Sequence, residues 1–294
     1  MSSYTTIIFT PIRKLLRNHF WEKILYALAK KHSLNSLISK IAPGNNLYKK
    51  GTIRKAKREG IHYILDISDY QHWLIYFGVN EDRPSGLFEL VKTGDLIIDI
   101  GANIGQTAMT FAKLGGENSM IYGFEPDPVN FLIAKENLKQ NKFKNIHYFN
   151  VGLGSKKEEL SLKINSPQNR GGNRIDRNRS EESFTIKIES LDDLIAQLNI
   201  ENVNLIKIDV EGFEKEVLEG AIKTIKKFSP TLFIEIDDRN LQEQETSARE
   251  LVDYISSLGY ICVNATNKKT IKSSIDLKNC HFDVICNSNN LLIS

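Results

Sequence analysis

Apolar and polar residues alternate in blocks along most of the chain, and these blocks predict strands and helices in turn. Continuous apolar runs, typical of strands buried on both faces, occupy residues 96–100, 120–124, 146–151, 203–210 and 231–237. Apolar residues at helical spacing occupy 104–114, 127–141, 191–198, 214–227 and 246–258. This alternation predicts an α/β fold with a Rossmann-like, mostly parallel, doubly wound sheet that has helices on both faces.

The first 94 residues break this alternation and predict an N-terminal helical and strand extension. Residues 1–45 are predicted to form two helical pieces, the first starting at Pro11. Its apolar stripe lies among basic side chains and consists of Ile12, Leu16, Phe20, Ile24 and Leu28. We therefore expect a basic amphipathic helical leader (1–45), a cap segment over the mouth of a ligand site (46–94) and a Rossmann-like domain (95–294).

A glycine-rich turn, DIGANIG at residues 99–105, follows the first predicted core strand. Its glycines let the backbone approach a ligand closely, and Glu125 ends the next strand, where an acid can accept hydrogen bonds from ribose hydroxyls. The turn departs from the GxGxxG of dinucleotide sites. Asp99, two residues before the first glycine, suits a cation better than a pyrophosphate. The sequence therefore favours S-adenosylmethionine, which carries an ammonium and a sulfonium, over a turn without a ligand.

A second group of polar residues falls at the predicted ends of later strands, where ligands bind in open α/β sheets. Lys207, Asp209 and Glu211 alternate along one strand and should point the same way, which makes them the candidate catalytic residues. Three interpretations stay open. In the first, Asp209 or Glu211 takes or orients the proton of a hydroxyl acceptor. In the second, Asp209, Glu211 and Glu235 hold a divalent metal that acidifies the acceptor hydroxyl. In the third, Lys207 neutralises the acids and the group only fixes the strand end.

Several short stretches carry a resemblance to a known family: 99–105 (DIGANIG), 123–128 (GFEPDP), 150–155 (NVGLGS), 190–194 (SLDDL), 205–212 (LIKIDVEG) and 233–236 (FIEI). They resemble the FkbM-type methyltransferases of the class I S-adenosylmethionine-dependent group, over about residues 86–287. The resemblance implies an antiparallel last strand and a loop after residues 146–151 that passes the adenine. The expected cofactor-binding residues are Asp99, Gly101, Ala102, Asn103, Gly105, Gln106, Glu125, Pro126, Asn150 and Val151.

The expected activity is methyl transfer from S-adenosylmethionine, with a hydroxyl of a saccharide or related small metabolite as acceptor. The glycan or small-molecule acceptor follows from the resemblance alone. The alternatives are a nicotinamide-linked oxidoreductase, which the turn disfavours, and a non-catalytic nucleoside-binding module. No nucleic-acid partner is expected, because no Pro-Pro-aromatic element follows Lys207 and basic and aromatic residues are not interleaved.

Charge is distributed unevenly. The chain carries a net +3, whereas residues 1–60 hold thirteen Lys and Arg against Glu22 and Glu59, a net +11 that leaves −8 for the remainder. A basic amphipathic helix can lie on an anionic bilayer, so we expect either peripheral membrane contact or a helix packed on the catalytic domain. Residues 166–183, with four arginines (Arg170, Arg174, Arg177 and Arg179), either bind an anionic group of the acceptor or form a disordered surface loop.

Composition is that of an ordinary soluble globular protein, with 294 residues of which 26% are charged. No apolar run reaches the ~18 residues of a membrane span, and no signal peptide is evident. The cysteines are Cys262, Cys280 and Cys286, without a CxxC pair. This set argues against disulfides or a zinc site and for a reducing, cytoplasmic compartment. The sequence does not indicate an oligomeric state.

Overall fold

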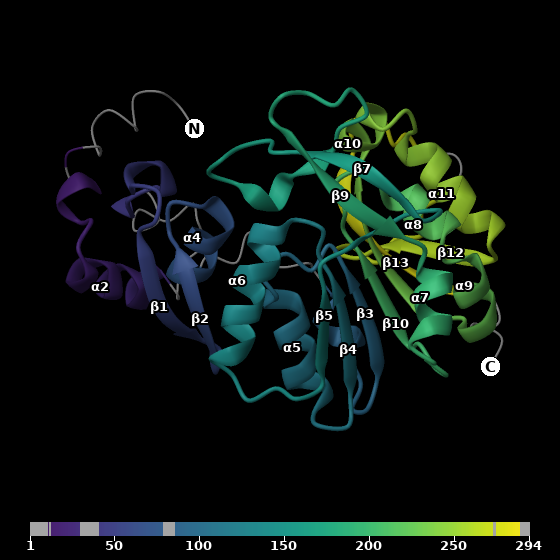
Figure 1. Ribbon diagram of the computed structural model, residues 1–294, viewed down its shortest axis with the longest axis horizontal. Coiled ribbons are helices and arrows are strands. Elements are labelled where there is room, and N and C mark those ends of the chain that lie inside the picture. The colour runs from purple at the N-terminus through teal and green to yellow at the C-terminus, as the bar shows by residue number, and fades with distance from the viewer. Residues whose placement is uncertain (1–10, 12, 30–40, 79–85, 273–274, 289–294) are drawn as a thin grey trace. The chain divides into compact units, whose positions relative to one another are not determined.

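A computed structural model describes residues 11, 13–29, 41–78, 86–272 and 275–288. The chain forms two compact units (Figure 1). The first comprises Met1–Arg83 with Ser166–Gly171, and the second Pro84–Asn165 with Gly172–Ser294. The predicted core strands all lie in the second unit.

A seven-stranded sheet, counted over the described residues, forms the centre of the second unit, with the order β12-β13-β11-β10-β3-β4-β5. Its strands are β3 (Leu96–Ile100), β4 (Met120–Phe124), β5 (Ile146–Phe149), β10 (Leu205–Ile208), β11 (Thr231–Asp237), β12 (Tyr260–Asn264) and β13 (His281–Ser288). Strands β5, β4, β3, β10 and β11 run parallel, and β13 is antiparallel to both β11 and β12. The predicted fold class, a mostly parallel sheet with an antiparallel last strand, is confirmed. The strand order reverses between β3 and β10, which is where ligands bind in such sheets.

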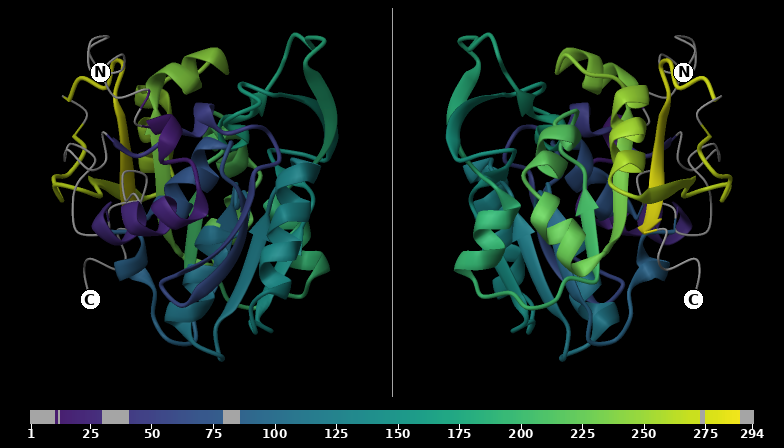
Figure 2. Two further views of the ribbon diagram at one scale, coloured as in Figure 1. Left: turned by 90° about the vertical axis from the view of Figure 1, so that its left-hand side faces the viewer. Right: turned by 90° about the vertical axis from the view of Figure 1, so that its right-hand side faces the viewer.

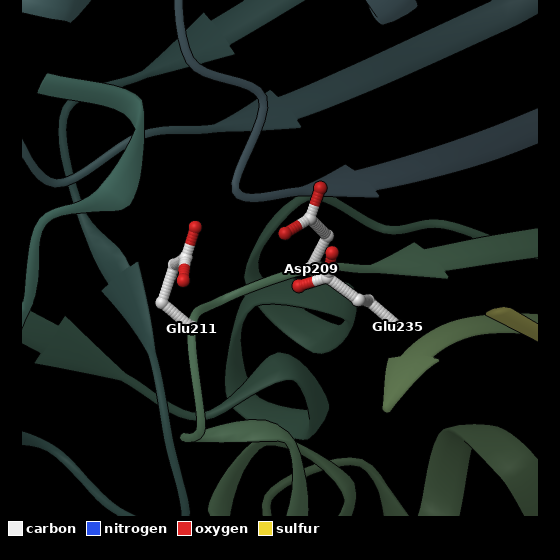
Figure 3. A group of neighbouring side chains, drawn as sticks. All are labelled: Asp209, Glu211 and Glu235. Carbon is white, nitrogen blue, oxygen red and sulfur yellow. The ribbon is translucent and has the colours of Figure 1, made fainter. Parts of the chain in front are cut away.

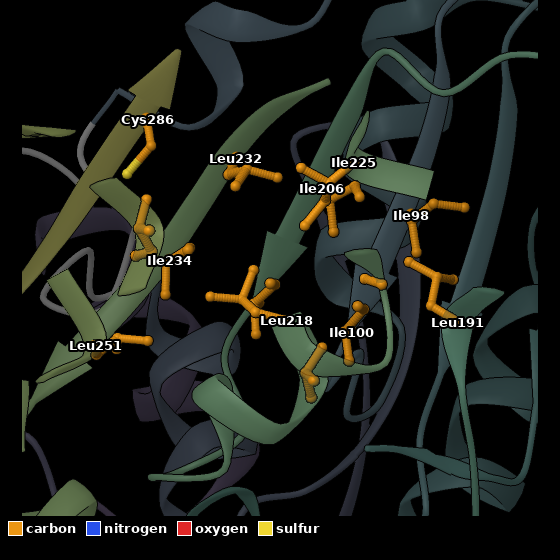
Figure 4. Packing of buried hydrophobic residues seen from close by; sticks show 14 of the residues in the cluster. Ile98, Ile100, Leu191, Ile206, Leu218, Ile225, Leu232, Ile234, Leu251 and Cys286 are labelled. Atoms are coloured by element: carbon orange, nitrogen blue, oxygen red, sulfur yellow. The ribbon is translucent and has the colours of Figure 1, made fainter. Parts of the chain in front are cut away.

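Helices cover both faces of this sheet (Figures 1 and 2). They are α5 (Gln106–Gly115), α6 (Pro128–Lys139), α7 (Leu191–Gln197), α8 (Glu214–Glu219), α9 (Ile222–Phe228), α10 (Asp238–Glu243) and α11 (Ala248–Ser257), with a short 3₁₀ helix η2 (Phe88–Leu90) before β3. Figure 4 shows Ile206 and Ile234 of the strands packed with Leu218 and Leu251 of the covering helices. Phe111 of α5 belongs to the hydrophobic cluster on the other face. Burial on both faces explains the continuous apolar runs of the strands.

The single helix predicted over residues 214–227 is wrong. Residues 214–227 form two helices, α8 and α9, instead of one. The chain bends at Gly220, where a Cβ atom would lie 1.9 Å from the carbonyl oxygen of Gly154. The close approach of the neighbouring loop therefore requires glycine at the bend, which a periodicity argument does not register. Two helices begin with a side-chain cap: Asp127 accepts a hydrogen bond from the Val129 N–H (2.8 Å) and Ser190 from the Asp193 N–H (3.2 Å).

A second sheet has the order β6-β9-β7-β8. Its strands are β6 (Gly152–Leu153), β7 (Glu158–Lys163), β8 (Arg174–Ile175) and β9 (Ser183–Glu189). Strands β7 and β9 pair antiparallel. The arginine-rich segment 166–183 contains the 3₁₀ helix η3 (Arg170–Gly172) and β8, whose Ile175 pairs with Leu162. The alternative of a disordered loop is therefore wrong.

The first unit contains α2 (His19–Ala29), η1 (Asn45–Leu47), the antiparallel hairpin β1 (Ile53–Arg58) and β2 (Ile61–Asp66), and α4 (Tyr70–Phe77). The predicted apolar stripe of a single helix from Pro11 is wrong, because the helix is interrupted at residues 16–18 and Phe20 is exposed. Leu25 is buried in its place. Ile12 and the Leu28 side chain lie outside the described residues.

Cys262 on β12 and Cys286 on β13 occupy directly opposite register positions and form a disulfide. The expectation that the cysteines form no disulfide is wrong for this pair, since pairing depends on a strand register that the sequence spacing does not reveal. Cys280 is free. No helix in the part of the chain that the structure describes has the length and hydropathy to cross a membrane.

Candidate active site

The glycine-rich turn between β3 and α5 is held by side chains from β4 and β5. The buried Glu125 carboxylate accepts hydrogen bonds from the N–H groups of Asn103 (2.8 Å) and Asp127 (2.9 Å). The Tyr148 hydroxyl donates to the Asn103 carbonyl oxygen (2.5 Å). Asn103 lies in the left-handed region with φ 49°. The acid expected to lie beside the turn therefore does so, and it also fixes the shape of the turn.

Burial raises the pKa of Glu125 to about 7, although the backbone N–H groups of Asp127 and Asn103 favour its ionised form. Each carboxylate oxygen has two lone pairs, so Glu125 can accept further hydrogen bonds from a ligand. Asn150 donates through Nδ2 to the carbonyl oxygens of Glu125 (2.9 Å) and Pro126 (3.0 Å). Glu125, Pro126 and Asn150 therefore form one hydrogen-bonded group at the ends of β4 and β5. The next residue, Val151, is half-buried.

Gly101 joins this turn to the end of β10. Its φ is 75°, and a Cβ atom there would lie 1.8 Å from the carbonyl oxygen of Asp209. The two backbones approach so closely that only glycine fits. Ala102 and Gly105 are buried in the same turn, and Gln106 begins α5.

Lys207 lies between two carboxylates. Its Nζ is 3.5 Å from Asp99 Oδ1 and 3.2 Å from Asp209 Oδ2, and it donates to the Gly101 carbonyl oxygen (2.9 Å). Burial disfavours the charged amine, but the carboxylates of Asp209 and Asp99 outweigh burial and raise the pKa of Lys207. Lys207 is therefore a buried cation. Neither carboxylate oxygen of Asp99, which is 0% exposed, accepts a hydrogen bond from the residues that the structure describes.

The predicted acids gather at the carboxyl ends of β10 and β11, Asp209 and Glu211 just after β10 and Glu235 within β11. Carboxylate oxygens of Asp209, Glu211 and Glu235 all lie within 4.8 Å of one another (Figure 3). The Asp209 side chain is 39% exposed, the most of the three. Glu211 does not continue the strand alternation as expected, because β10 ends at Ile208 and Glu211 lies in the turn with φ 56°. Its carboxylate reaches the group from that turn and accepts a hydrogen bond from Asn240 Nδ2 (2.7 Å).

Crowding of these acids changes their protonation. Burial, followed by the charges of Glu235 and Asp209, raises the pKa of Glu211 to about 9. Burial and Asp209 also raise the pKa of Glu235. Burial raises the pKa of Asp283, opposite Glu235 on β13, to about 7. The acidic group therefore attracts protons or other cations.

Sequence reasoning missed three partners of this group: His281, Asp283 and Arg174. His281 Nε2 lies 3.1 Å from Glu235 Oε1, and this hydrogen bond raises the pKa of His281 to about 9 against the effect of burial. Arg174 Nε lies 3.8 Å from Glu211 Oε2, and Arg174 donates through Nη1 to Glu243 (2.8 Å). For His281 and Asp283 the only signal in the sequence was their alternation along the last strand, which acquires a meaning once β13 pairs with β11.

Residues 99–262, more than half of the chain, match the family described as the Methyltransferase FkbM domain. The chain belongs to this family. The resemblance seen in the short stretches is thereby confirmed, and both the glycine-rich turn and the acidic group lie within the matched FkbM region.

Individual relatives of the FkbM domain are distant. The chain is 27% identical to the 2-O-methyltransferase NoeI of Sinorhizobium fredii, over 57% of this chain and 74% of that protein. It is 31% identical to the hexuronic acid methyltransferase AglP of Haloferax volcanii, over 48% of this chain and about half (55%) of the relative. The crystal structure of Methyltransferase FkbM from Methylobacillus flagellatus superposes with a TM-score of 0.46 and 16% identity, covering 73% of this chain and 52% of that one.

The residues around the turn fit the S-adenosylmethionine expected of an FkbM methyltransferase. Glu125 offers an acid and Asn150 an amide, and the neighbouring Lys207 is already paired with two carboxylates. Such a set suits a ligand with hydroxyl and ammonium groups better than a phosphate, which needs free cationic donors. Among the predicted cofactor residues, Asn103, Glu125, Pro126 and Asn150 are therefore connected by hydrogen bonds at the turn, whereas Asp99 faces Lys207.

Proposed function

We propose that the protein is an S-adenosylmethionine-dependent O-methyltransferase whose acceptor is a hydroxyl of a saccharide or related metabolite. The family supports methyl transfer, and the names of NoeI and AglP, which specify 2-O-methylation and a hexuronic acid, support the oxygen and the sugar. The observation that carries the proposal is the partly exposed Asp209 carboxylate beside the glycine-rich turn, at the switch point of the sheet.

In this proposal the turn and the ends of β4 and β5 hold the cofactor. Glu125 accepts hydrogen bonds from the ribose hydroxyls, Asn150 and Val151 border the base, and the backbone of 101–106 receives the amino acid end. Asp99 acts through Lys207, with which it pairs. When bound, S-adenosylmethionine supplies an electrophilic methyl group for in-line displacement by the acceptor oxygen.

Asp209 is the proposed general base. Its carboxylate accepts a hydrogen bond from the acceptor hydroxyl, which directs a lone pair of the acceptor oxygen at the methyl group. The carboxylate takes the hydroxyl proton as the bond between the acceptor oxygen and the methyl carbon forms. Lys207 Nζ lies 3.2 Å from Asp209 Oδ2 and so restrains the orientation of that carboxylate. Glu211, held by Asn240, and Glu235, held by His281, border the acceptor side.

A divalent metal is a second candidate for activating the hydroxyl. Carboxylate oxygens of Asp209, Glu211 and Glu235 lie within 4.8 Å of one another, and hard cations such as Mg²⁺ prefer oxygen ligands. Titration of the chelated protein with Mg²⁺ or Mn²⁺ separates the candidates. A base mechanism predicts activity that a chelator does not change, whereas a metal mechanism predicts loss and recovery.

The test of the proposed activity is a panel of neutral and acidic sugar glycosides incubated with the protein and S-adenosylmethionine. Release of S-adenosylhomocysteine is measured, and mass spectrometry locates the added methyl group. Release with at least one glycoside, abolished in Asp209→Asn but kept in the exposed Asp253→Asn, supports the proposal. Stabilisation by S-adenosylhomocysteine without release from any acceptor would support the binding module, and stabilisation by NAD instead would support the oxidoreductase.

A further inference from the structure

Helix α2 of the first unit buries one side and exposes apolar residues on the other. On the buried side Glu22, which is 0% exposed, pairs with Arg54 through Nε (2.8 Å) and Nη2 (3.0 Å), and the Tyr76 hydroxyl donates to it (3.1 Å). Leu25 is buried beside it. These contacts with β1 and α4 fix the orientation of the helix within its unit.

The opposite side carries large apolar side chains that the unit does not cover. Phe20 is 66% and Trp21 43% exposed, and their rings are in edge-to-face contact at 5.4 Å. Leu15, in the helical turn before α2, is 77% exposed. Adjacent exposed apolar residues of this size mark a contact surface for a partner.

The charges on this segment are basic. Lys14, Arg17 and Lys23 are exposed among the apolar residues. Glu22, the acid of the same segment, points inward and its charge is matched by Arg54. We define the α2 surface as Lys14, Leu15, Arg17, Phe20, Trp21 and Lys23. It combines aromatic rings, an aliphatic side chain and cations without a compensating acid among these six residues.

We propose that the α2 surface binds the anionic face of a lipid bilayer. Tryptophan and phenylalanine favour the boundary between headgroups and acyl chains, and lysine and arginine are attracted to anionic headgroups. The exposed Leu15 decides against single-stranded nucleic acid, because an aliphatic side chain offers no ring on which a base can stack. The proposal rests on the first unit and does not depend on the methyltransferase activity.

The chain carries a built-in reporter for this contact. It has two tryptophans, Trp21 and Trp73. Trp73 is buried, and its Nε1 donates to the Pro43 carbonyl oxygen (2.7 Å). A change in tryptophan emission on addition of vesicles therefore reports Trp21.

The experiment adds phosphatidylcholine vesicles, with or without about one third phosphatidylglycerol, to the full chain. We expect a blue shift of emission and co-sedimentation with the anionic vesicles only. The double variant Phe20→Ser/Trp21→Ser should sediment at least about tenfold less, since each ring loses its burial in lipid. Lys14→Gln/Lys23→Gln should reduce binding by about fivefold for each charge removed.

The matched control is Val129→Ser/Leu132→Ser, which removes two exposed apolar residues of α6 in the second unit and should bind as the parent does. Because all substituted positions are exposed, the variants should keep the circular dichroism spectrum of the parent. Unchanged emission with anionic vesicles, or equal losses in the control, would overturn the proposal. A shift produced by single-stranded RNA but not by vesicles would assign the surface to nucleic acid, and a concentration-dependent shift without vesicles would assign it to a second copy of the chain.

Discussion

The two halves of the candidate active site satisfy their buried polar groups in different ways. At the ends of β3, β4 and β5, Glu125 is held by two backbone N–H groups, that of Asn103 in the glycine-rich turn and that of Asp127. At the ends of β10, β11 and β13, three carboxylates crowd together and their neighbours are the side chains Lys207, His281 and Arg174. Backbone donors are fixed by the fold, whereas side-chain cations can be displaced.

This difference matches two tasks. A half built on backbone hydrogen bonds keeps one shape and suits an invariant cofactor. A half built on mutually repelling acids stores electrostatic energy that a proton, a metal or a hydroxyl donor can release. Variants that alter one half should therefore affect different measurements from variants that alter the other.

The largest effect is expected at Asp209. Asp209→Asn removes the proposed base and should lower kcat by about 10²–10⁴-fold, while the affinity for S-adenosylhomocysteine stays unchanged. Single-turnover methylation of an acceptor from the glycoside panel measures the loss of rate, and calorimetry measures the affinity for S-adenosylhomocysteine. Asp253→Asn, at an exposed position paired with Arg249, is the control. Equal turnover by Asp209→Asn and the control would exclude Asp209 as base.

The next largest effect is expected at Lys207, which belongs to both halves. Lys207→Met leaves Asp99 buried without its cation and should lower the free energy of unfolding by about 3–5 kcal/mol. The double variant Lys207→Met/Asp99→Asn removes the uncompensated charge and should recover part of that loss. Urea unfolding measures both, with the exposed Lys226→Met as control. A double variant no more stable than the single one would show that Asp99 is not charged in the folded protein.

A smaller effect is expected at Glu125. Glu125→Gln keeps one acceptor oxygen for two backbone N–H groups, so the turn should lose about 1–3 kcal/mol of stability and bind S-adenosylhomocysteine more weakly. Chemical unfolding and calorimetry measure the two losses. Glu136→Gln, an exposed position on α6, should change neither. Undiminished affinity in Glu125→Gln would exclude the ribose contact.

The last effect is a dependence of stability on pH at Glu214 of α8. Burial raises its pKa to about 8, although it accepts hydrogen bonds from the N–H groups of Gly212 (3.0 Å) and Val210 (3.3 Å). Between the unfolded pKa near 4.3 and about 8 the folded chain keeps a proton that the unfolded chain has lost. The free energy of unfolding should therefore fall as pH rises through this window, by about 1.4 kcal/mol per pH unit.

Glu214→Gln should remove this component of the slope, whereas Glu219→Gln, at an exposed position of the same helix, should keep it. Thermal unfolding in a pH series measures the difference. Parallel curves for the two variants would contradict a proton held at Glu214.

How far the sequence predicts the site differs between the two halves. The glycine-rich turn and Glu125 lie close together in the chain, and local spacing was enough to predict them. The acids of the second half were predicted because they end apolar strands. His281 and Asp283 were missed, because they reach Glu235 only when β13 lies beside β11.

The same reason accounts for the other differences. The Cys262–Cys286 disulfide depends on strand register. The break between α8 and α9 at Gly220 depends on the close approach of a loop more than sixty residues earlier in the chain. The exposure of Phe20 depends on the inward ion pair of Glu22 with Arg54. Each is a contact between residues distant in sequence, which periodicity cannot register. Residue propensities and hydrophobic periodicity specify helices and strands. Which distant residues contact one another is decided only by tertiary packing.

The position of β13 has a consequence for how the molecule is made. This strand is inserted between β11 and β12, which precede it in the chain and do not pair with each other. During synthesis the sheet must stay open at that place until His281–Ser288 leaves the ribosome, with two unpaired strand edges exposed in the meantime. A nascent chain stalled before His281 should thus be a target for chaperones and proteases, and assembly of the acidic group should be among the last events of folding.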